Sequence, residues 1–174
     1  MKFKVSLFIV VAVFALAAGI QFTYGADKLS EKEWKKFDGA WFEIQYPADF
    51  RVEPSLKGTT STEGHDSAFF VSPSNDVAFY VFSPQWNGEP SDIFLKQDTE
   101  KQLSCEKADK DGKKIEQFTI ESQDGSYFRT YEDLQDPETN TRRVFGIRYK
   151  DQKTLDQYKE QYKRFQESLV QFAD

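Results

Sequence analysis

Apolar and polar residues alternate along much of the chain after residue 40, which is the pattern of half-buried β-strands. Phe42, Ile44 and Tyr46 share one face of a strand predicted over residues 41–46, and Pro47 ends its pairing. Further strands are predicted over residues 50–52, 68–71, 77–82, 115–122, 127–134 and 143–149. The last three form an antiparallel meander, because the turn Asp124-Gly125 is a strong hairpin signal.

The segment 77–82 differs from the other strands because it contains no polar residue. A strand of this kind is typical of the middle of a sheet that is covered on both faces. We therefore expect one layer above and one layer below the sheet at this strand.

Three helices are predicted. A capping box at Ser30 and Glu33 indicates a short helix over residues 30–37, and Pro90-Ser91-Asp92 indicates a second over residues 90–105. The third begins with a capping box at Thr154 and carries an apolar stripe of Leu155, Tyr158, Tyr162, Phe165, Leu169 and Phe172. We interpret that stripe as core packing; the alternatives are a partner helix or a membrane surface.

The order of these elements is short helix, strands, helix, three-stranded meander and long helix. It favours an α+β fold, a three-layer α/β/α sandwich on a mostly antiparallel sheet. The polar segment 54–66 is longer than most connections in a compact domain, so it is either mobile or functional.

Residues 1–25 have the pattern of a secretory signal peptide. Lys2 and Lys4 precede an apolar run over residues 5–20, and small residues stand before a cut at Ala26. The run is shorter than the roughly 20 residues that cross a bilayer, although an uncleaved anchor is the alternative. We expect an exported protein, periplasmic or extracellular, with one domain over residues 26–174 and no stable membrane anchor after cleavage.

Composition excludes several classes of function. The net charge of −6 becomes −8 once the two lysines of the signal are removed, which argues against a nucleic-acid surface. One His and one Cys exclude paired-imidazole sites, an internal disulfide and CxxC motifs. The sequence also lacks GxSxG, GxGxxG and P-loop motifs, so no cofactor is expected.

Three segments carry a family resemblance. Residues 42–53 (FEIQYPADFRVE), the polar turn and apolar strand of residues 74–84, and the closing stretch 165–172 are each similar to a part of the PsbP-like proteins, relatives of a photosystem II extrinsic subunit. The resemblance covers roughly residues 34–172. It implies the α/β/α fold and a non-enzymatic binding or assembly domain that docks on other proteins.

The loop residues Glu63, His65 and Asp66 are candidate ligands for a loosely bound divalent ion. The alternative is a solvated loop, because a metal site needs a convergent third or fourth ligand. We favour the solvated loop and assign no metal, and we keep the three residues as weak candidates for binding.

Two further residues have competing interpretations. Trp86 lies in a turn, where it is either an exposed anchor for a partner or a buried cap on the sheet edge; we favour burial and keep it as a weak binding candidate. Cys105 could act with His65 as nucleophile and base. We interpret Cys105 instead as an apolar contact at a helix end, because one Cys and one His are no motif.

Three functions remain open at this point. The first is an exported, non-catalytic domain that docks on a protein partner, with an acidic surface that favours a basic one. The second is a small-ligand binder with a pocket between the sheet and loop 54–66. The third is an enzyme with paired carboxylates, which we rank last.

Overall fold

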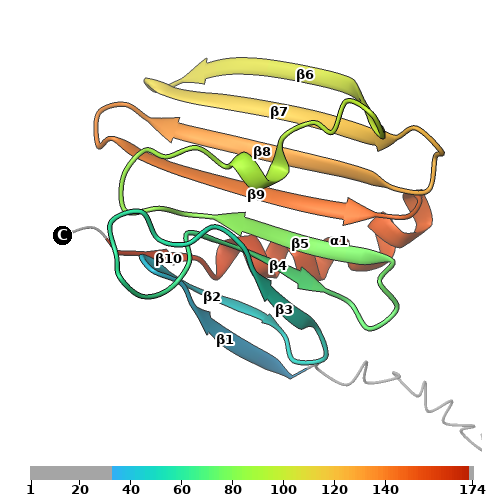
Figure 1. The fold of residues 1–174 in the computed structure, drawn as a ribbon, viewed down its shortest axis with the longest axis horizontal. Helices are drawn as coiled ribbons and strands as arrows, with labels where there is room; N and C mark the ends of the chain where they lie inside the picture. Colours follow the sequence, from blue (N-terminus) through green and yellow to red (C-terminus); the bar gives the residue numbers. More distant parts are fainter. Residues whose placement is uncertain (1–32, 173–174) are drawn as a thin grey trace, which may run out of the picture. The chain divides into compact units, whose positions relative to one another are not determined.

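The structure is a computed structural model that describes residues 33–172. Ten strands, one 3-10 turn and one α-helix follow one another in these residues (Figure 1). Their order is β1 (Trp34–Asp38), β2 (Phe42–Pro47), β3 (Arg51–Pro54), β4 (Ser67–Val71), β5 (Val77–Phe82), η1 (Ser91–Ile93), β6 (Glu100–Lys110), β7 (Lys113–Ser122), β8 (Phe128–Asp136), β9 (Thr141–Tyr149), α1 (Gln152–Glu167) and β10 (Val170–Gln171).

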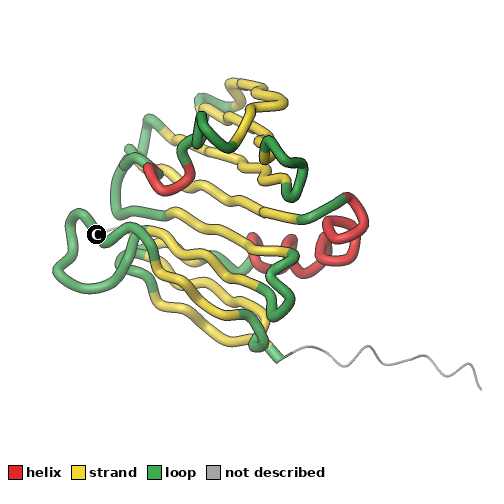
Figure 2. The backbone as a smooth tube through the Cα atoms, turned by 45° about the vertical axis from the view of Figure 1, so that its right-hand side comes forward, coloured by secondary structure: helices red, strands yellow, loops and turns green. Residues whose placement is uncertain are grey.

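The strands form two antiparallel sheets. The larger has seven strands in the order β3-β4-β5-β9-β8-β7-β6, and the smaller has three in the order β1-β2-β10. Helix α1 lies on one side of the larger sheet and η1 on the other (Figure 2). The expected α+β class and the mostly antiparallel sheet are confirmed.

The main core lies between the larger sheet, α1 and the smaller sheet. Phe165 of α1 is fully buried against Phe70, Phe79 and Phe145, with ring centroids 5.1 to 6.1 Å away. Phe42 of β2 belongs to the same cluster. The interpretation of the helical stripe as core packing is therefore confirmed for Leu155, Tyr158, Tyr162, Phe165 and Leu169.

A second core covers the opposite face of the sheet. It is built from Tyr80 and Phe82 of β5 with Tyr131, Val144 and Ile93. Every residue of β5 is buried, so the prediction that this strand is covered on both faces is confirmed. The cover on this face is the segment 83–99 with its single 3-10 turn, in place of the second predicted helix (Figure 1).

The predicted helix over residues 90–105 is wrong. Helical structure stops after Ile93, because Phe94 is extended (φ −57°, ψ 149°), and residues 100–110 pair with β7 as the edge strand of the sheet. The turn that joins β6 to β7 is Asp111-Gly112, and both residues have positive φ (53° and 77°), as a tight hairpin requires.

The predicted helix over residues 30–37 is also wrong where the structure describes it. Residues 34–38 form β1, which pairs along the edge of β2 from Trp34–Pro47 to Asp38–Glu43. Pairing with a neighbouring strand outweighs the local helix signal there. Ser30 and the predicted signal peptide over residues 1–25 lie outside the described residues.

Helix α1 differs from its prediction at both ends. Asp151 caps it by accepting a hydrogen bond from the Thr154 amide (2.8 Å), and it ends at Glu167. Residues 170–171 turn into a strand on β2, which leaves Phe172 44% exposed and outside the predicted stripe. No helix within residues 33–172 is long and apolar enough to cross a membrane.

Candidate functional site

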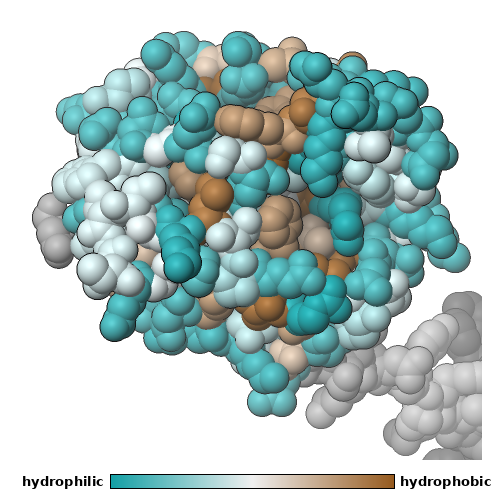
Figure 3. Space-filling view, viewed as in Figure 1, coloured by the Kyte–Doolittle hydropathy of each residue, from teal (hydrophilic) through white to brown (hydrophobic). Residues whose placement is uncertain are grey.

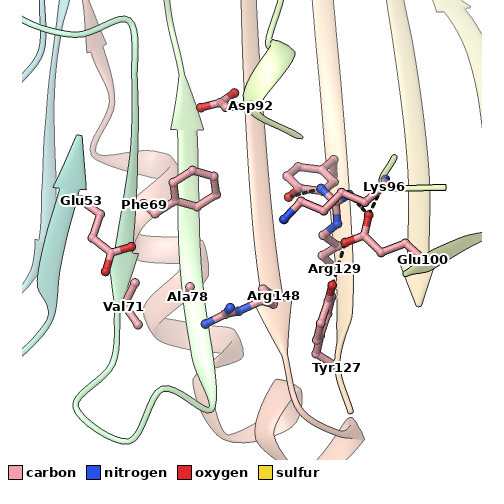
Figure 4. Close-up of a pocket in the computed structure, with 11 residues that line it drawn as sticks. Glu53, Phe69, Val71, Ala78, Asp92, Lys96, Glu100, Tyr127, Arg129 and Arg148 are labelled. Atoms are coloured by element: carbon pink, nitrogen blue, oxygen red, sulfur yellow. Dashed lines mark hydrogen bonds and ion pairs between the residues drawn. The ribbon is translucent and has the colours of Figure 1, made fainter. Parts of the chain in front are cut away.

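A cavity of about 410 Å³ opens on the face of the larger sheet opposite α1 (Figure 4). Its floor comes from β4, β5, β8 and β9, and its rim from β3 and the segment 92–100. The lining residues are Glu53, Phe69, Val71, Ala78, Asp92, Lys96, Glu100, Tyr127, Arg129, Tyr131 and Arg148.

One row of side chains crosses the floor from apolar to basic. Val71 lies directly opposite Ala78, Ala78 opposite Arg148, and Arg148 opposite Arg129 on neighbouring strands. Residues directly opposite one another point to the same face of a sheet. The small side chain of Ala78 lets Arg148 reach across it toward β4 (Figure 4).

The next row of the floor is aromatic. The ring centroids of Phe69 and Tyr80 lie 4.7 Å apart, and those of Tyr80 and Tyr131 lie 5.7 Å apart. Gly146 lies between these two tyrosines in the register, and a Cβ there would come within 2.3 Å of the Tyr131 ring. Gly146 therefore lets the Tyr131 ring lie across β9 and form a wall of the cavity.

A buried ion pair holds the basic side of the cavity in place. Arg129 donates to the carboxylate of Glu100, to the carbonyl oxygens of Ile93 (2.8 Å) and Phe94 (3.0 Å), and to the Tyr131 hydroxyl (3.1 Å). The side chains of Arg129 and Glu100 are 7% and 1% exposed. These bonds tie the segment 92–100 to β8, so that the rim is fixed on the sheet.

Glu100 accepts three kinds of hydrogen bond. Besides Arg129, the Tyr127 hydroxyl (2.8 Å) and the Lys96 backbone amide (2.8 Å) donate to it. Burial alone would raise the pKa of Glu100, but these hydrogen bonds outweigh burial and hold the pKa below its ordinary value. Glu100 is therefore an ionised structural partner of Arg129.

The other two acids of the wall also have partners. Asp92 accepts hydrogen bonds from the hydroxyls of Tyr80 (2.7 Å) and Ser67 (2.6 Å). Burial first, and then the charge of Asp92, raises the pKa of Tyr80 well above its ordinary value, so its hydroxyl stays a neutral donor. Glu53 accepts from the guanidinium of Arg51 (2.7 and 2.9 Å).

Two cations of the cavity remain without a counter-ion. Neither the Lys96 ammonium nor the Arg148 guanidinium has an ion-pair partner within residues 33–172. The Nε of Arg129 is buried and also lacks an acceptor among the described residues. The space-filling view shows apolar surface at the centre of this face, surrounded by polar side chains (Figure 3). The arrangement can accept an anionic group beside an apolar one.

The residues that the sequence suggested lie elsewhere. Glu63, His65 and Asp66 precede the start of β4, and Trp86 follows the end of β5. Because β4 and β5 are antiparallel, all four are at the end of these strands away from the Val71–Ala78 pair. None of them lines the cavity.

Asp66 has a structural role in its loop. It is 1% exposed, and its Oδ2 accepts a hydrogen bond from the Thr59 amide (3.1 Å), whereas Oδ1 has no partner in the described chain. Burial raises the pKa of Asp66, and the Thr59 hydrogen bonds offset only part of this effect. Glu63 is exposed, and the His65 backbone pairs with Lys57 and Ala40. Residues 33–172 contain no group of three or more His, Cys, Asp or Glu side chains placed to hold a metal ion.

The favoured burial of Trp86 is wrong, since the side chain is 39% exposed. Cys105 is also exposed, on β6 and not at a helix end, and its thiol lies 3.2 Å from Glu116. Five strand spacings of roughly 4.8 Å separate β6 from β4, next to His65. The Cys105–His65 pair is therefore not formed.

The cavity residues carry no local motif, which is why sequence reasoning missed them. One signal was present in the sequence. Arg129 is two residues from Tyr131, and Arg148 is two residues from Gly146, so both arginines lie on the same face of the sheet as these residues. A charged residue at an inward-facing position indicates a buried partner or a site. The sequence does not show that β8 pairs with β9 in the register that brings the two arginines together, so this signal alone could not locate the site.

Comparison with known proteins gives structural likenesses at low identity. No protein-family model matches the sequence, and no curated protein matches it. Cyanobacterial PsbP (CyanoP) from Synechocystis sp. PCC 6803 is 10% identical with a TM-score of 0.47, over 83% of this chain and 96% of that one. The Ran-binding protein Mog1p of Saccharomyces cerevisiae is 8% identical with a TM-score of 0.42, over 82% of this chain and 97% of that one.

Proposed function

We propose that this chain is an exported, non-catalytic binding domain that docks on a protein partner through the face that carries the cavity. The observation that carries the proposal is the pair of uncompensated cations, Lys96 and Arg148, beside an apolar floor. Interfaces use such features, because an apolar anchor and a complementary charge together give affinity and orientation. The signal-like pattern of residues 1–25 supports export.

The contacts within the cavity favour binding over catalysis. A general base needs a carboxylate that is free to take a proton from a substrate. Asp92 and Glu100 accept hydrogen bonds that join the covering segment to the sheet, and Glu53 is paired with Arg51 of its own strand. Their observed role is structural.

The charge distribution suggests the character of the partner's surface. The cavity has unpaired positive groups, whereas the protein as a whole carries a net charge of −6. A complementary partner would present an acidic and an apolar group to the cavity, with basic residues around them.

Site-specific photo-crosslinking tests the docking face. A photo-reactive side chain at the exposed residue Gln97, next to the cavity, is expected to capture one protein from the exported fraction. The matched control is the same side chain at Lys159, which is exposed on α1 on the other side of the sheet. The Arg148→Gln substitution should lower the yield from position 97. Equal capture from both positions, or capture from position 159 alone, would contradict docking through this face.

A small-ligand binder is the second candidate, and the cavity volume of about 410 Å³ favours it. Ligand pockets commonly measure about 300–1,000 Å³. The cavity is not where the sequence placed a pocket: Glu53 borders loop 54–66, but no residue of that loop lines the cavity.

A further inference from the structure

We propose that the cavity receives the carboxylate of an acidic side chain of the partner protein, presented beside an apolar side chain. This inference rests on the proposed function and names the group that the partner inserts. It follows from three properties of the cavity walls: two opposed arginines that share one counter-ion, a lysine whose backbone is held beside them, and an adjacent apolar floor.

The first property is the opposition of two like charges. Arg129 and Arg148 lie directly opposite each other on β8 and β9. Like charges in this position destabilise a sheet. Glu100 neutralises Arg129 alone, because Arg129 is the cation to which it is hydrogen-bonded. A carboxylate bound at Arg148 would supply the missing negative charge.

The second property is the position of Lys96. Its backbone amide donates to Glu100 (2.8 Å), so the origin of this side chain is fixed relative to the buried ion pair. Lys96 and Arg148 therefore line the cavity from two separate elements, the covering segment and the sheet (Figure 4). Each of these two cations lines the cavity without an ion-pair partner among residues 33–172, so either one can pair with a carboxylate that enters it.

The third property limits the charge and shape of the occupant. Val71 and Ala78 are each 4% exposed and lie opposite each other beside Arg148, with Phe69 on the adjoining row. Phe69 is only half-buried, so an apolar side chain can lie against its ring next to the acid. The carboxylates of Glu53, Asp92 and Glu100 remain in the walls and would repel a polyanion such as a nucleic acid. Glu53 is paired with Arg51 and Glu100 with Arg129, whereas Asp92 is bonded only to hydroxyl groups. The charges of Lys96 and Arg148 against that of Asp92 therefore leave one positive charge, which a single carboxylate would balance.

Titration with two capped dipeptides tests this inference by NMR. Acetyl-Phe-Glu-amide is expected to shift the backbone amides of Val71, Ala78 and Arg148 in a saturable way. Acetyl-Phe-Gln-amide, which has the same shape without the charge, should bind about tenfold more weakly or worse, the loss expected for one charge-assisted hydrogen bond. Phenylacetate is a third probe. It has a carboxylate and an aromatic ring, as the acidic dipeptide has, but no peptide backbone, so it tests whether the cavity binds a free small acid.

Matched variants assign the effect to the cavity. Arg148→Gln should lose the response to the acidic dipeptide, whereas Arg143→Gln should keep it, since Arg143 is on the same strand but faces the opposite side of the sheet. Lys96→Gln provides a second variant at an exposed position, should Arg148→Gln fail to fold.

Several results would overturn the inference. Equal binding of both dipeptides would remove its charge basis, and binding of phenylacetate without either dipeptide would assign the cavity to a free small acid. A response that survives both Arg148→Gln and Lys96→Gln would place the acid elsewhere. These outcomes are independent of the photo-crosslinking result, which alone decides whether the face docks on a protein.

Discussion

At the scale of single residues, the Arg129–Glu100 pair shows how a buried charge is retained in this protein. Each charge is satisfied by several partners, because Arg129 donates to two backbone carbonyls and Glu100 accepts from Tyr127 and from a backbone amide. Burial of an ion pair costs free energy unless such additional hydrogen bonds are formed. The pair therefore positions the covering segment on the sheet.

Substitution of Glu100 by Gln should reduce stability, because it leaves the charge of Arg129 buried without a counter-ion. We expect a loss of about 3–5 kcal/mol in the free energy of unfolding at pH 7. The folded-state pKa of Glu100 lies below its ordinary value of 4.5, so its ionised form stabilises the fold above pH 4.5. This contribution is lost as the pH falls through the folded-state pKa. The difference in the free energy of unfolding between wild type and Glu100→Gln should thus become smaller at acid pH.

Urea denaturation at pH 7 and at pH 3 measures this gap. Glu106→Gln is the matched control, because Glu106 is on the same strand and exposed. The control should differ from wild type by no more than about 0.5 kcal/mol. A gap between wild type and Glu100→Gln that is equal at both pH values would show that the charge of Glu100 is not what stabilises the fold.

At the scale of elements, α1 joins the two sheets into one core. Its fully buried residue, Phe165, has rings of both β4 and β5 around it, and the adjacent Ser168 hydroxyl accepts a hydrogen bond from Gln45 of β2 (2.9 Å). The apolar stripe of the helix thus packs in one cluster with side chains of both the larger and the smaller sheet.

Replacing Phe165 by Ala should therefore lower the free energy of unfolding by about 3–5 kcal/mol, through lost burial and the cavity that remains. The measurement is a shift of the chemical denaturation midpoint. Phe172→Ala is the control, since Phe172 is 44% exposed and belonged to the same stripe in the sequence. An unchanged midpoint for Phe165→Ala would contradict the burial of this helix face.

At the scale of the whole described chain, burial is concentrated on one half of the larger sheet. Strand β5 is buried throughout and lies in the interior of the sheet, between β4 and β9. Strand β6 is exposed from Lys101 onward and is the edge strand at the end of the sheet away from β3. The lysines of β6 and the register shift at Gln102/Ser104 are features that discourage pairing of an open edge with another chain.

Amide hydrogen exchange should follow this gradient. The slowest exchange is expected in β5 and β9, and much faster exchange in β6, because its outer edge and both its faces are accessible. Mass spectrometry of exchanged peptides resolves these strands. Equal protection of β5 and β6 would contradict an open edge at β6.

The sequence by itself determined the elements whose signals are local. The uninterrupted apolar run of residues 77–82 predicted a strand covered on both faces, and Phe79 and Tyr80 are 0% and 1% exposed. The spacing of Leu155, Tyr158, Tyr162 and Phe165 predicted the helix face that is buried. In each case the residues that carry the pattern are neighbours on a strand or helix, so the period alone reports the buried face.

Tertiary structure alone decided the edges and the site. Residues 34–38 and 100–110 form strands because their backbones hydrogen-bond to β2 and β7. Their own sequences do not indicate these partners, which come from elsewhere in the chain. The cavity brings together Lys96, Arg129 and Arg148, which are separated along the chain and adjacent only through pairing of β8 with β9 and the covering segment. Charges that meet across strands depend on register, and register is set by the whole sheet.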